Sequence, residues 1–171
     1  MRAYRMLRGA LGARFYDEFL ISGEHIPYRI IVTGSREWHD EDAVKAALRP
    51  WWRGGHTTLV HGDCHIYNRR TRRYEPAGAD AIADRLWRQA GGTVEPWPVK
   101  PEDWKRFGKS AGPRRNSLMV EAGADHVIAF VPTDREARGT LGCVDLARKA
   151  GIPVTIVEGS IGVGHEHSAR R

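Results

Sequence analysis

The stretch RIIVTGSRE at residues 29–37 joins an apolar, β-branched run to a short polar turn that begins at Gly34. A continuous apolar run of this length, stopped by a glycine, is typical of a strand buried on both faces of a parallel sheet. Comparable runs recur along the chain at 57–61 (TTLVH), 93–97 (TVEPW), 125–130 (DHVIAF) and 152–157 (IPVTIV). The sequence therefore predicts about five parallel strands.

Helical patterns separate these strands. Apolar residues at three- and four-residue spacing predict helices at 39–52, 79–90, 113–122 and 139–150. Asp40 is a suitable N-cap for the first helix, and Leu118 and Met119 are expected to point inward from the third. Residues 98–112 are predicted to form a long loop with one short helical turn at 103–107. The alternation indicates an α/β fold, a Rossmann-like doubly wound sheet of about five parallel strands with helices on both faces.

The 171 residues fit one domain at 28–158, with a helical N-terminal extension at 1–27 and a C-terminal tail at 159–171. No apolar run is long enough to span a membrane, and charges interrupt the N-terminal segment, so neither a membrane anchor nor a secretory signal is expected. Two cysteines without a disulfide pattern favour a cytoplasmic location. Cys64 lies near His61 and His65, but no second ligand pair lies within the domain, so we expect no metal and no cofactor.

Ligands of open α/β sheets bind beyond the carboxyl ends of the strands, so the residues after each predicted strand form the candidate site. Glycines there let a backbone approach a ligand, arginines fork onto phosphate, and helix N-termini attract anions. The ligand-binding candidates are Gly34, Ser35, Arg36, Gly62, Gly78, Asp80, Arg114, Arg115, Asn116, Arg138, Gly139 and Thr140. The chain has neither GxGxxG nor GxxxxGKS/T, which disfavours a standard dinucleotide or P-loop site.

Several motifs together resemble one family. They are RIIVTGSREW (29–38), LVHGDC (59–64), GADAIAD (78–84), KSAGPRRNSLMV (109–120), EAGADHVIAF (121–130), and a late Gly139-Thr140 followed by ARKAGIPV (147–154). Their order and spacing are similar to the cpYpsA-related branch of the SLOG superfamily, Rossmann-like domains of bacteria and phages. This superfamily includes the LONELY GUY phosphoribohydrolases and DprA. The resemblance covers residues 28–157 and implies binding of nucleotides or molecules derived from them.

The sequence departs from the family pattern in two places. The family usually runs from HGxC almost directly into GAD, whereas here the basic insert HIYNRRTRRYEPA occupies residues 65–77. The phosphoribohydrolases carry PGGxGTxxE, whose glutamate helps to cleave the glycosidic bond. The corresponding stretch here is TDREARGTLGC (133–143), and Cys143 stands at the glutamate position. The resemblance therefore supports binding more strongly than hydrolysis.

Three functions stay open at this point. The leading one is a binding or sensing domain for a nucleotide-type, phosphate-bearing small molecule. The second is a nucleotide hydrolase, with catalytic candidates Glu37, His61 and Asp80 and with Asp63 as a further acid or base. The third is nucleic-acid binding, which the net charge of +6 favours and for which the basic insert supplies Arg69, Arg70, Arg72 and Arg73 between two tyrosines. Trp51 and Trp52 fit either a homo-oligomer interface or core packing.

Overall fold

A five-stranded parallel sheet forms the centre of the molecule. The computed structural model describes residues 28–52 and 56–161. The strand order is β5-β2-β1-β6-β7, and every neighbouring pair in this sheet is parallel. The strands are β1 (Tyr28–Gly34), β2 (Thr57–His61), β5 (Thr93–Pro96), β6 (His126–Pro132) and β7 (Val154–Gly159). The predicted α/β, doubly wound architecture is confirmed.

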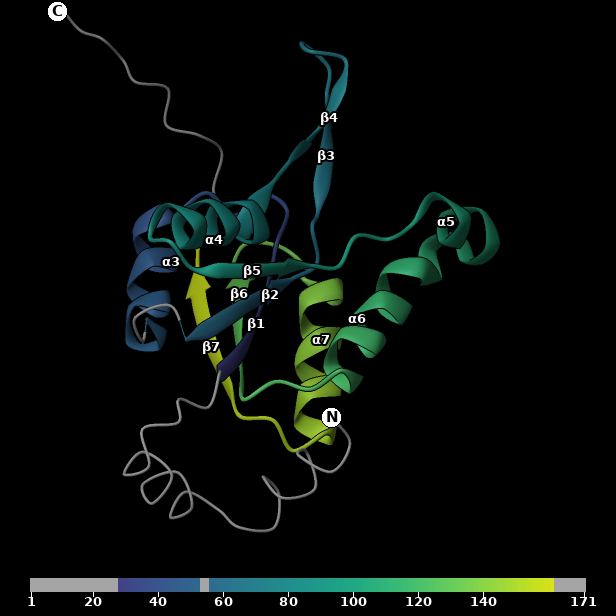
Figure 1. Cartoon of the computed structure of the whole chain (residues 1–171). Helices are drawn as coiled ribbons and strands as arrows, with labels where there is room; N and C mark the ends of the chain where they lie inside the picture. The colour runs from purple at the N-terminus through teal and green to yellow at the C-terminus, as the bar shows by residue number, and fades with distance from the viewer. Residues whose placement is uncertain (1–27, 53–55, 162–171) are drawn as a thin grey trace, which may run out of the picture.

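Helices cover both faces of the sheet (Figure 1). One face carries α3 (Glu41–Leu48), the 3-10 turn η1 (Arg49–Trp51) and α4 (Gly78–Gln89). The opposite face carries α6 (Ala111–Glu121) and α7 (Arg138–Lys149). Asp40 caps α3 as predicted, because its Oδ1 accepts from the Ala43 amide at 2.9 Å.

The alternation of side chains along β1 divides the interior into two cores. Ile30 and Val32 point toward α3 and α4, where they pack in one cluster with Trp38 and Phe130. Ile31 points toward α6 and α7 and joins a second cluster. Burying each such aliphatic side chain contributes about 1.5–3 kcal/mol to folding. A strand that is apolar on both faces thus requires helices on both sides.

The tryptophans after α3 pack within the chain. Trp51 packs against the core cluster under α3 and α4, and its ring lies 4.4 Å from the ring of His126. The ring of Trp52 meets that of Trp87 edge-on at 5.2 Å. Of the two interpretations left open by the sequence, the structure therefore supports intramolecular packing. Glycines commonly end helices, and the two that follow this segment, Gly54 and Gly55, lie outside the described residues.

The segment between β5 and α6 differs from its prediction. Most of residues 98–112 is helical, with α5 at Pro101–Phe107 and the 3-10 turn η2 at Gly108–Ser110. The predicted helical turn at 103–107 is therefore found within α5, whereas the predicted long loop around it is wrong. Pro101 opens α5, where its missing N–H costs nothing. Met119 is buried as expected, but Leu118 is 56% exposed, because it lies on the outer side of α6.

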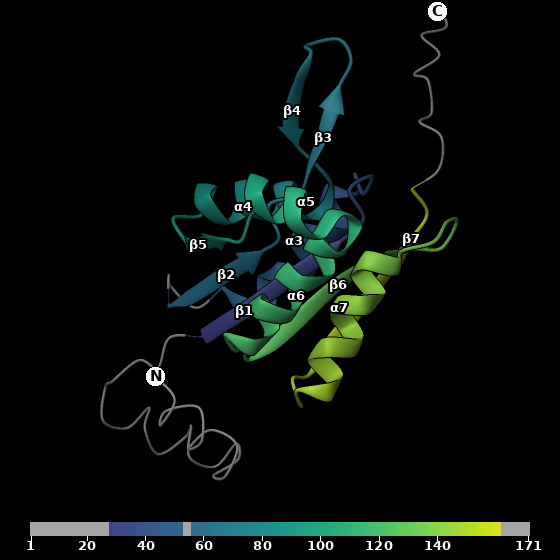
Figure 2. The ribbon, with the colours of Figure 1, turned by 90° about the vertical axis from the view of Figure 1, so that its right-hand side faces the viewer.

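The basic insert is also ordered rather than a loop. Residues His65–Asn68 (β3) and Arg73–Pro76 (β4) pair antiparallel as a two-stranded hairpin. Figures 1 and 2 show this hairpin projecting away from the helices and the main sheet. Its position after β2 places its base at the carboxyl edge of the main sheet.

The sheet has a topological switch point between the parallel strands β1 and β6. The chain adds β2 and β5 on one side of β1, then crosses over to add β6 and β7 on the other. In open α/β sheets such a switch point leaves a crevice at the carboxyl ends of the two strands. After β7, Ile161 is buried in the α3/α4 core, so the chain packs against the domain beyond residue 158. The predicted N-terminal extension lies outside the described residues, and none of the described helices is both long and apolar enough to cross a membrane.

Candidate ligand-binding site

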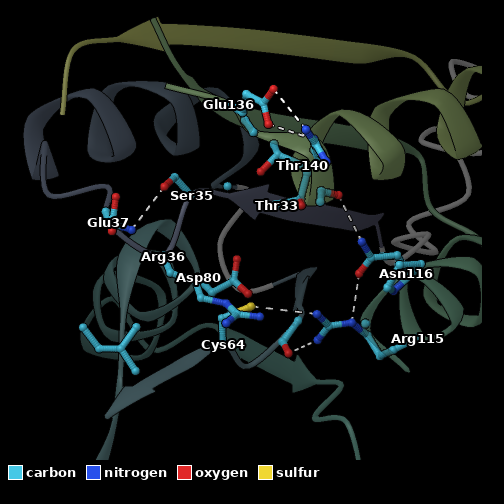
Figure 3. A pocket seen from close by; sticks show the side chains of 18 of the residues that line it. Thr33, Ser35, Arg36, Glu37, Cys64, Asp80, Arg115, Asn116, Glu136 and Thr140 are labelled. Carbon is cyan, nitrogen blue, oxygen red and sulfur yellow. Dashed lines mark hydrogen bonds and ion pairs between the residues drawn. The ribbon is translucent and has the colours of Figure 1, made fainter. Parts of the chain in front are cut away.

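A cavity of about 510 Å³ opens at this switch point (Figure 3). Its walls come from the loops after β1, β2 and β6 and from the first turns of α4, α6 and α7. Eleven of the predicted site residues line it: Gly34, Ser35, Arg36, Glu37, Gly62, Asp80, Arg115, Asn116, Arg138, Gly139 and Thr140. The parallel sheet therefore brings together residues that are up to about a hundred positions apart in the sequence.

His61 does not face this cavity. Its side chain is 2% exposed, and its Nε2 lies 2.9 Å from Asp84 Oδ1. Its Nδ1 accepts from the backbone amide of Asp63 at 3.0 Å. Because both ring nitrogens have partners inside the protein, His61 has a structural role here, and its place outside the cavity lining gives no support to the predicted acid or base role.

Arg114 and Gly78 also lie outside the cavity lining. The Arg114 guanidinium stacks 4.1 Å above the centre of the Phe107 ring, so it holds α5 against α6. Gly78 has a φ of +70°, and a Cβ there would come within 2.1 Å of the Ser35 carbonyl oxygen. Gly78 therefore permits close packing of α4 against the loop after β1 and serves structure rather than direct binding.

Asp80 contributes a buried carboxyl group to the cavity. It lies in the first turn of α4, its side chain is 4% exposed, and Figure 3 shows its carboxyl group directed into the cavity. Its Oδ1 is buried and has no hydrogen-bond partner, alone among the buried side-chain nitrogens and oxygens of the described residues. Burial raises the pKa of Asp80, against the opposing influence of His61, Cys64 and Arg115. A buried oxygen left without a partner is costly, so it is a strong indicator of a missing hydrogen-bond donor.

Arg115 ties the floor of the cavity together. Its guanidinium donates to the carbonyl oxygens of Gly62 and of Trp97, the latter at 2.7 Å. Its Nε donates to Asn116 Oδ1 at 2.9 Å, and another nitrogen lies 3.8 Å from Cys64 Sγ. With so many internal acceptors, Arg115 acts first as a clamp between α6 and the strand ends. Its positive charge nevertheless remains on the cavity wall.

The first turns of two helices face open space in the cavity. The amides at the start of α7 have no intrahelical acceptor, and the N-cap residue Ala137 supplies no side-chain cap. A Cβ on Gly139, or on Gly112 of α6, would meet no atom within 4 Å. Asn116 Nδ2 donates to the Gly139 carbonyl at 3.3 Å and so holds the two helix ends side by side. An anion can therefore approach these amides closely.

Ion pairs border the mouth of the cavity. Glu37, 57% exposed, pairs with Arg135 across the gap between the loops after β1 and β6. Arg138 pairs with Glu136 at 2.8 Å, and both side chains are exposed. Glu37 is therefore a rim residue held by an arginine, whereas Arg36 makes no ion pair with any described residue.

Cys143 lies beneath the cavity, not in its wall. It is fully buried in the α6/α7 core, and burial raises its pKa to about 11. A hydrogen bond with Thr33 opposes this increase only in part. The position that carries the phosphoribohydrolase glutamate in the resemblance thus holds an inert thiol that points into the core.

Sequence reasoning did not select several lining residues. Thr33, Cys64, Ile66, Gly112, Pro113, Met119, Arg135, Glu136 and Ala137 also border the cavity. Most of them sit next to a predicted site residue, within TGSRE, HGDC, SAGPRRN or TDREARGT, so extending each motif by a few residues finds them.

Cys64 is half-buried, and burial together with the nearby Asp80 raises its pKa, whereas Arg115 opposes this increase. Nowhere in residues 28–52 and 56–161 do three His, Cys, Asp or Glu side chains gather closely enough to hold a metal ion.

A relative of this chain is known in a phage. The Gene 61 protein of Mycobacterium phage D29 is 42% identical over 131 residues, which span 74% of this chain and 93% of the phage protein. This chain belongs to the family of that phage protein. The relative's name denotes a gene number and no activity. No protein-family model matches the chain.

Proposed function

We propose that the cavity binds a nucleotide or nucleotide-derived ligand that carries a phosphate, as the resemblance to SLOG domains implies. The observation that carries the proposal is the unpartnered Oδ1 of Asp80, buried in the wall of a cavity that also exposes a helix N-terminus. Asp80 Oδ1 would accept a hydrogen bond from the ligand, and the helix N-terminus would attract its anionic group. A sugar phosphate supplies both requirements in one molecule.

The phosphate is assigned to the first turn of α7. The free amides of Arg138, Gly139 and Thr140, and the positive end of the helix dipole, stabilise an anion there. Gly139 leaves room for close approach, and Thr140 offers a hydroxyl group. Arg36, which also lines the cavity, supplies a positive charge.

A hydroxyl or amino group of the ligand is assigned to Asp80. Such a donor would complete the hydrogen bonding of Oδ1, which no described protein group does. Removing a buried acceptor of this kind costs about 1.5–3 kcal/mol, or about tenfold to more than a hundredfold in affinity. Asp80 therefore determines ligand choice, whereas the α7 amides accept any phosphate.

Hydrolysis of the bound nucleotide is the second candidate. Of the three predicted catalytic residues, Asp80 is a buried carboxyl group on the cavity wall, and its raised pKa suits a general acid. Glycoside cleavage usually needs two carboxyl groups. The second would be Glu37, which is exposed and paired with Arg135. Binding without turnover is thus the simpler reading of this geometry.

A thermal-shift screen tests the proposal. Purified protein is heated with nucleoside monophosphates, nucleotide sugars, ADP-ribose and cyclic dinucleotides. A ligand at about a hundred times its Kd stabilises the fold by about 2.7 kcal/mol, a shift of a few degrees in Tm. The shift should fall to about half or less in Asp80→Ala, which removes the buried acceptor, and decrease in Arg36→Ala. Chromatography of the same mixtures detects hydrolysis.

Arg114→Ala is the matched control. It removes the same charge as Arg36→Ala, but from a side chain stacked on Phe107 outside the cavity, so the ligand-induced shift should remain. Absence of any stabilising ligand, or equal losses in the two arginine variants, contradicts the assignment.

A further inference from the structure

The β3–β4 hairpin contributes nothing to either core. None of its residues belongs to the two buried clusters, yet it is ordered and tied at its base, where the Ala77 amide donates to the Cys64 carbonyl at 3.0 Å. Both views show it standing clear of the domain (Figures 1 and 2). A projecting element without a packing role presents its side chains to a partner.

The turn of the hairpin is held by polar contacts that engage its one acidic residue. Glu75 accepts from Asn68 Nδ2 at 2.7 Å and from the Thr71 hydroxyl at 2.6 Å. Asn68 Oδ1 in turn accepts from the Arg70 amide at 2.9 Å. These hydrogen bonds lower the pKa of Glu75. The carboxylate is thus committed to building the turn.

Four arginines surround this turn and remain available. Each of them is exposed, and none forms an ion pair with another described residue: Arg69, Arg70, Arg72 and Arg73. Arg72 adopts a φ of +57°, a left-handed conformation that lets the chain reverse direction within the turn. The concentrated positive charge repels itself and favours a polyanionic partner.

Two tyrosines lie on the strands just below the arginines. Tyr67 and Tyr74 are cross-strand partners, and their rings meet edge-on with centroids 5.3 Å apart. They are 50% and 73% exposed, respectively. The edge-on contact fixes the rings in place but leaves ring faces open. Open aromatic faces beside arginines form a platform on which unpaired bases stack.

We propose that the hairpin binds single-stranded nucleic acid, with the four arginines on the phosphates and the two tyrosines against the bases. A duplex keeps its bases stacked inside and would leave the tyrosine faces unused, whereas a single strand satisfies both features. The surface is separate from the assignment of the cavity ligand. Either proposal can therefore fail without the other.

Fluorescence anisotropy with full-length protein tests the inference. The probes are mixed-sequence single strands of about 20 nucleotides, one DNA and one RNA, together with the matching DNA duplex. A single strand should bind more tightly than the duplex, and the two single-stranded arms identify which sugar is preferred. If four phosphates are neutralised, the slope of log K against log salt should be about −2.8.

Two charge-matched variants locate the surface. One carries Arg69→Gln, Arg70→Gln, Arg72→Gln and Arg73→Gln. The other carries Lys45→Gln, Arg49→Gln, Arg148→Gln and Lys149→Gln, which removes the same four charges from exposed helix ends at the opposite edge of the sheet. The hairpin variant should lose about tenfold or more in affinity and most of the salt slope. The control should lose clearly less.

The tyrosines are tested by a second pair of variants. Tyr67→Leu with Tyr74→Leu should weaken single-strand binding by about fivefold or more, because base stacking contributes about 1–3 kcal/mol. Tyr67→Phe with Tyr74→Phe should retain it. Unchanged thermal unfolding confirms that each variant is folded. Tighter binding of the duplex, equal losses in the two charge variants, or no binding of any probe would overturn the inference.

Discussion

At the scale of single residues, the buried carboxyl group of Asp80 destabilises the ligand-free fold and leaves a hydrogen-bond acceptor unpartnered in the cavity wall. A carboxyl group this deeply buried, with one oxygen unpartnered, disfavours folding whenever it must ionise. The same unpartnered oxygen is what a ligand can satisfy. The ligand-free protein is therefore expected to be less stable than a variant that cannot ionise at position 80.

The raised pKa of Asp80 predicts how the stability difference between Asp80→Asn and the natural protein changes with pH. Below about pH 4 an aspartate is protonated in both the folded and unfolded states, so the substitution removes no ionisation cost. Above that pH the unfolded chain releases the proton, whereas the raised pKa of Asp80 keeps it bound in the folded protein. The variant should thus gain stability over the natural protein by up to about 1.4 kcal/mol per pH unit, until the folded pKa is reached.

Urea unfolding of both proteins from about pH 2 to pH 8 measures that difference. Asp84→Asn is the control with the opposite sign. Burial would raise the pKa of Asp84, but hydrogen bonds from Arg88 and His61 outweigh it and lower the pKa. Its contribution to stability is present above about pH 4 and is lost as the pH falls through the folded value. A difference for Asp80→Asn that stays flat with pH would contradict the account.

At the scale of elements, the start of α4 depends on a glycine. Gly78→Ala places a Cβ in a left-handed conformation and against the Ser35 carbonyl, so it should destabilise the fold by about 2–4 kcal/mol. Gly91→Ala is the matched control, because Gly91 has a similar φ of +80° and open space around it. It should cost only about 1–2 kcal/mol. Equal losses in chemical denaturation would show that the contact with the loop after β1 is unimportant.

Elements with strong apolar periodicity could be predicted from the sequence, and elements made by polar residues could not. The runs around Ile31 and Ile128 have to be buried, so β1 and β6 were found within two residues at either end. The β3–β4 hairpin was missed because its alternation is polar and its turn depends on Asn68, Thr71 and Glu75. Only residues 103–107 of α5 were predicted, as a short helical turn, for a related reason, since PEDWKRF buries no residue completely.

Within the site, too, some residues could be predicted from the sequence and others could not. The rule that ligands bind beyond the strand ends is enough to predict most of the cavity lining from the sequence. His61 and Arg114 lie outside the cavity lining, because a sequence does not show which way a side chain points. His61 turns to Asp84, and Arg114 stacks on Phe107. The packing role of Gly78 likewise depends on a contact with a residue more than forty positions away.

At the scale of the whole molecule, the residues that form the two cores are largely separate from those that line the cavity and form the hairpin. Both cores lie against the middle of the sheet, while the cavity and the hairpin share its carboxyl edge, with Ile66 of β3 lining the cavity. The cavity presents a helix N-terminus and a buried acceptor, and the hairpin presents positive charge and aromatic rings. Substitutions at that edge are therefore expected to leave the packed interior intact.

The reaction rate of Cys64 with iodoacetamide is the most direct test of where a ligand binds. Cys64 lies half-buried on the cavity wall, whereas Cys143 is fully buried and should not react in the folded protein. The best nucleotide from the thermal screen, at about ten times its Kd, should slow the modification of Cys64 about tenfold, because only ligand-free protein reacts. A nucleotide that stabilises the protein yet leaves this rate unchanged would place its site elsewhere and contradict the account.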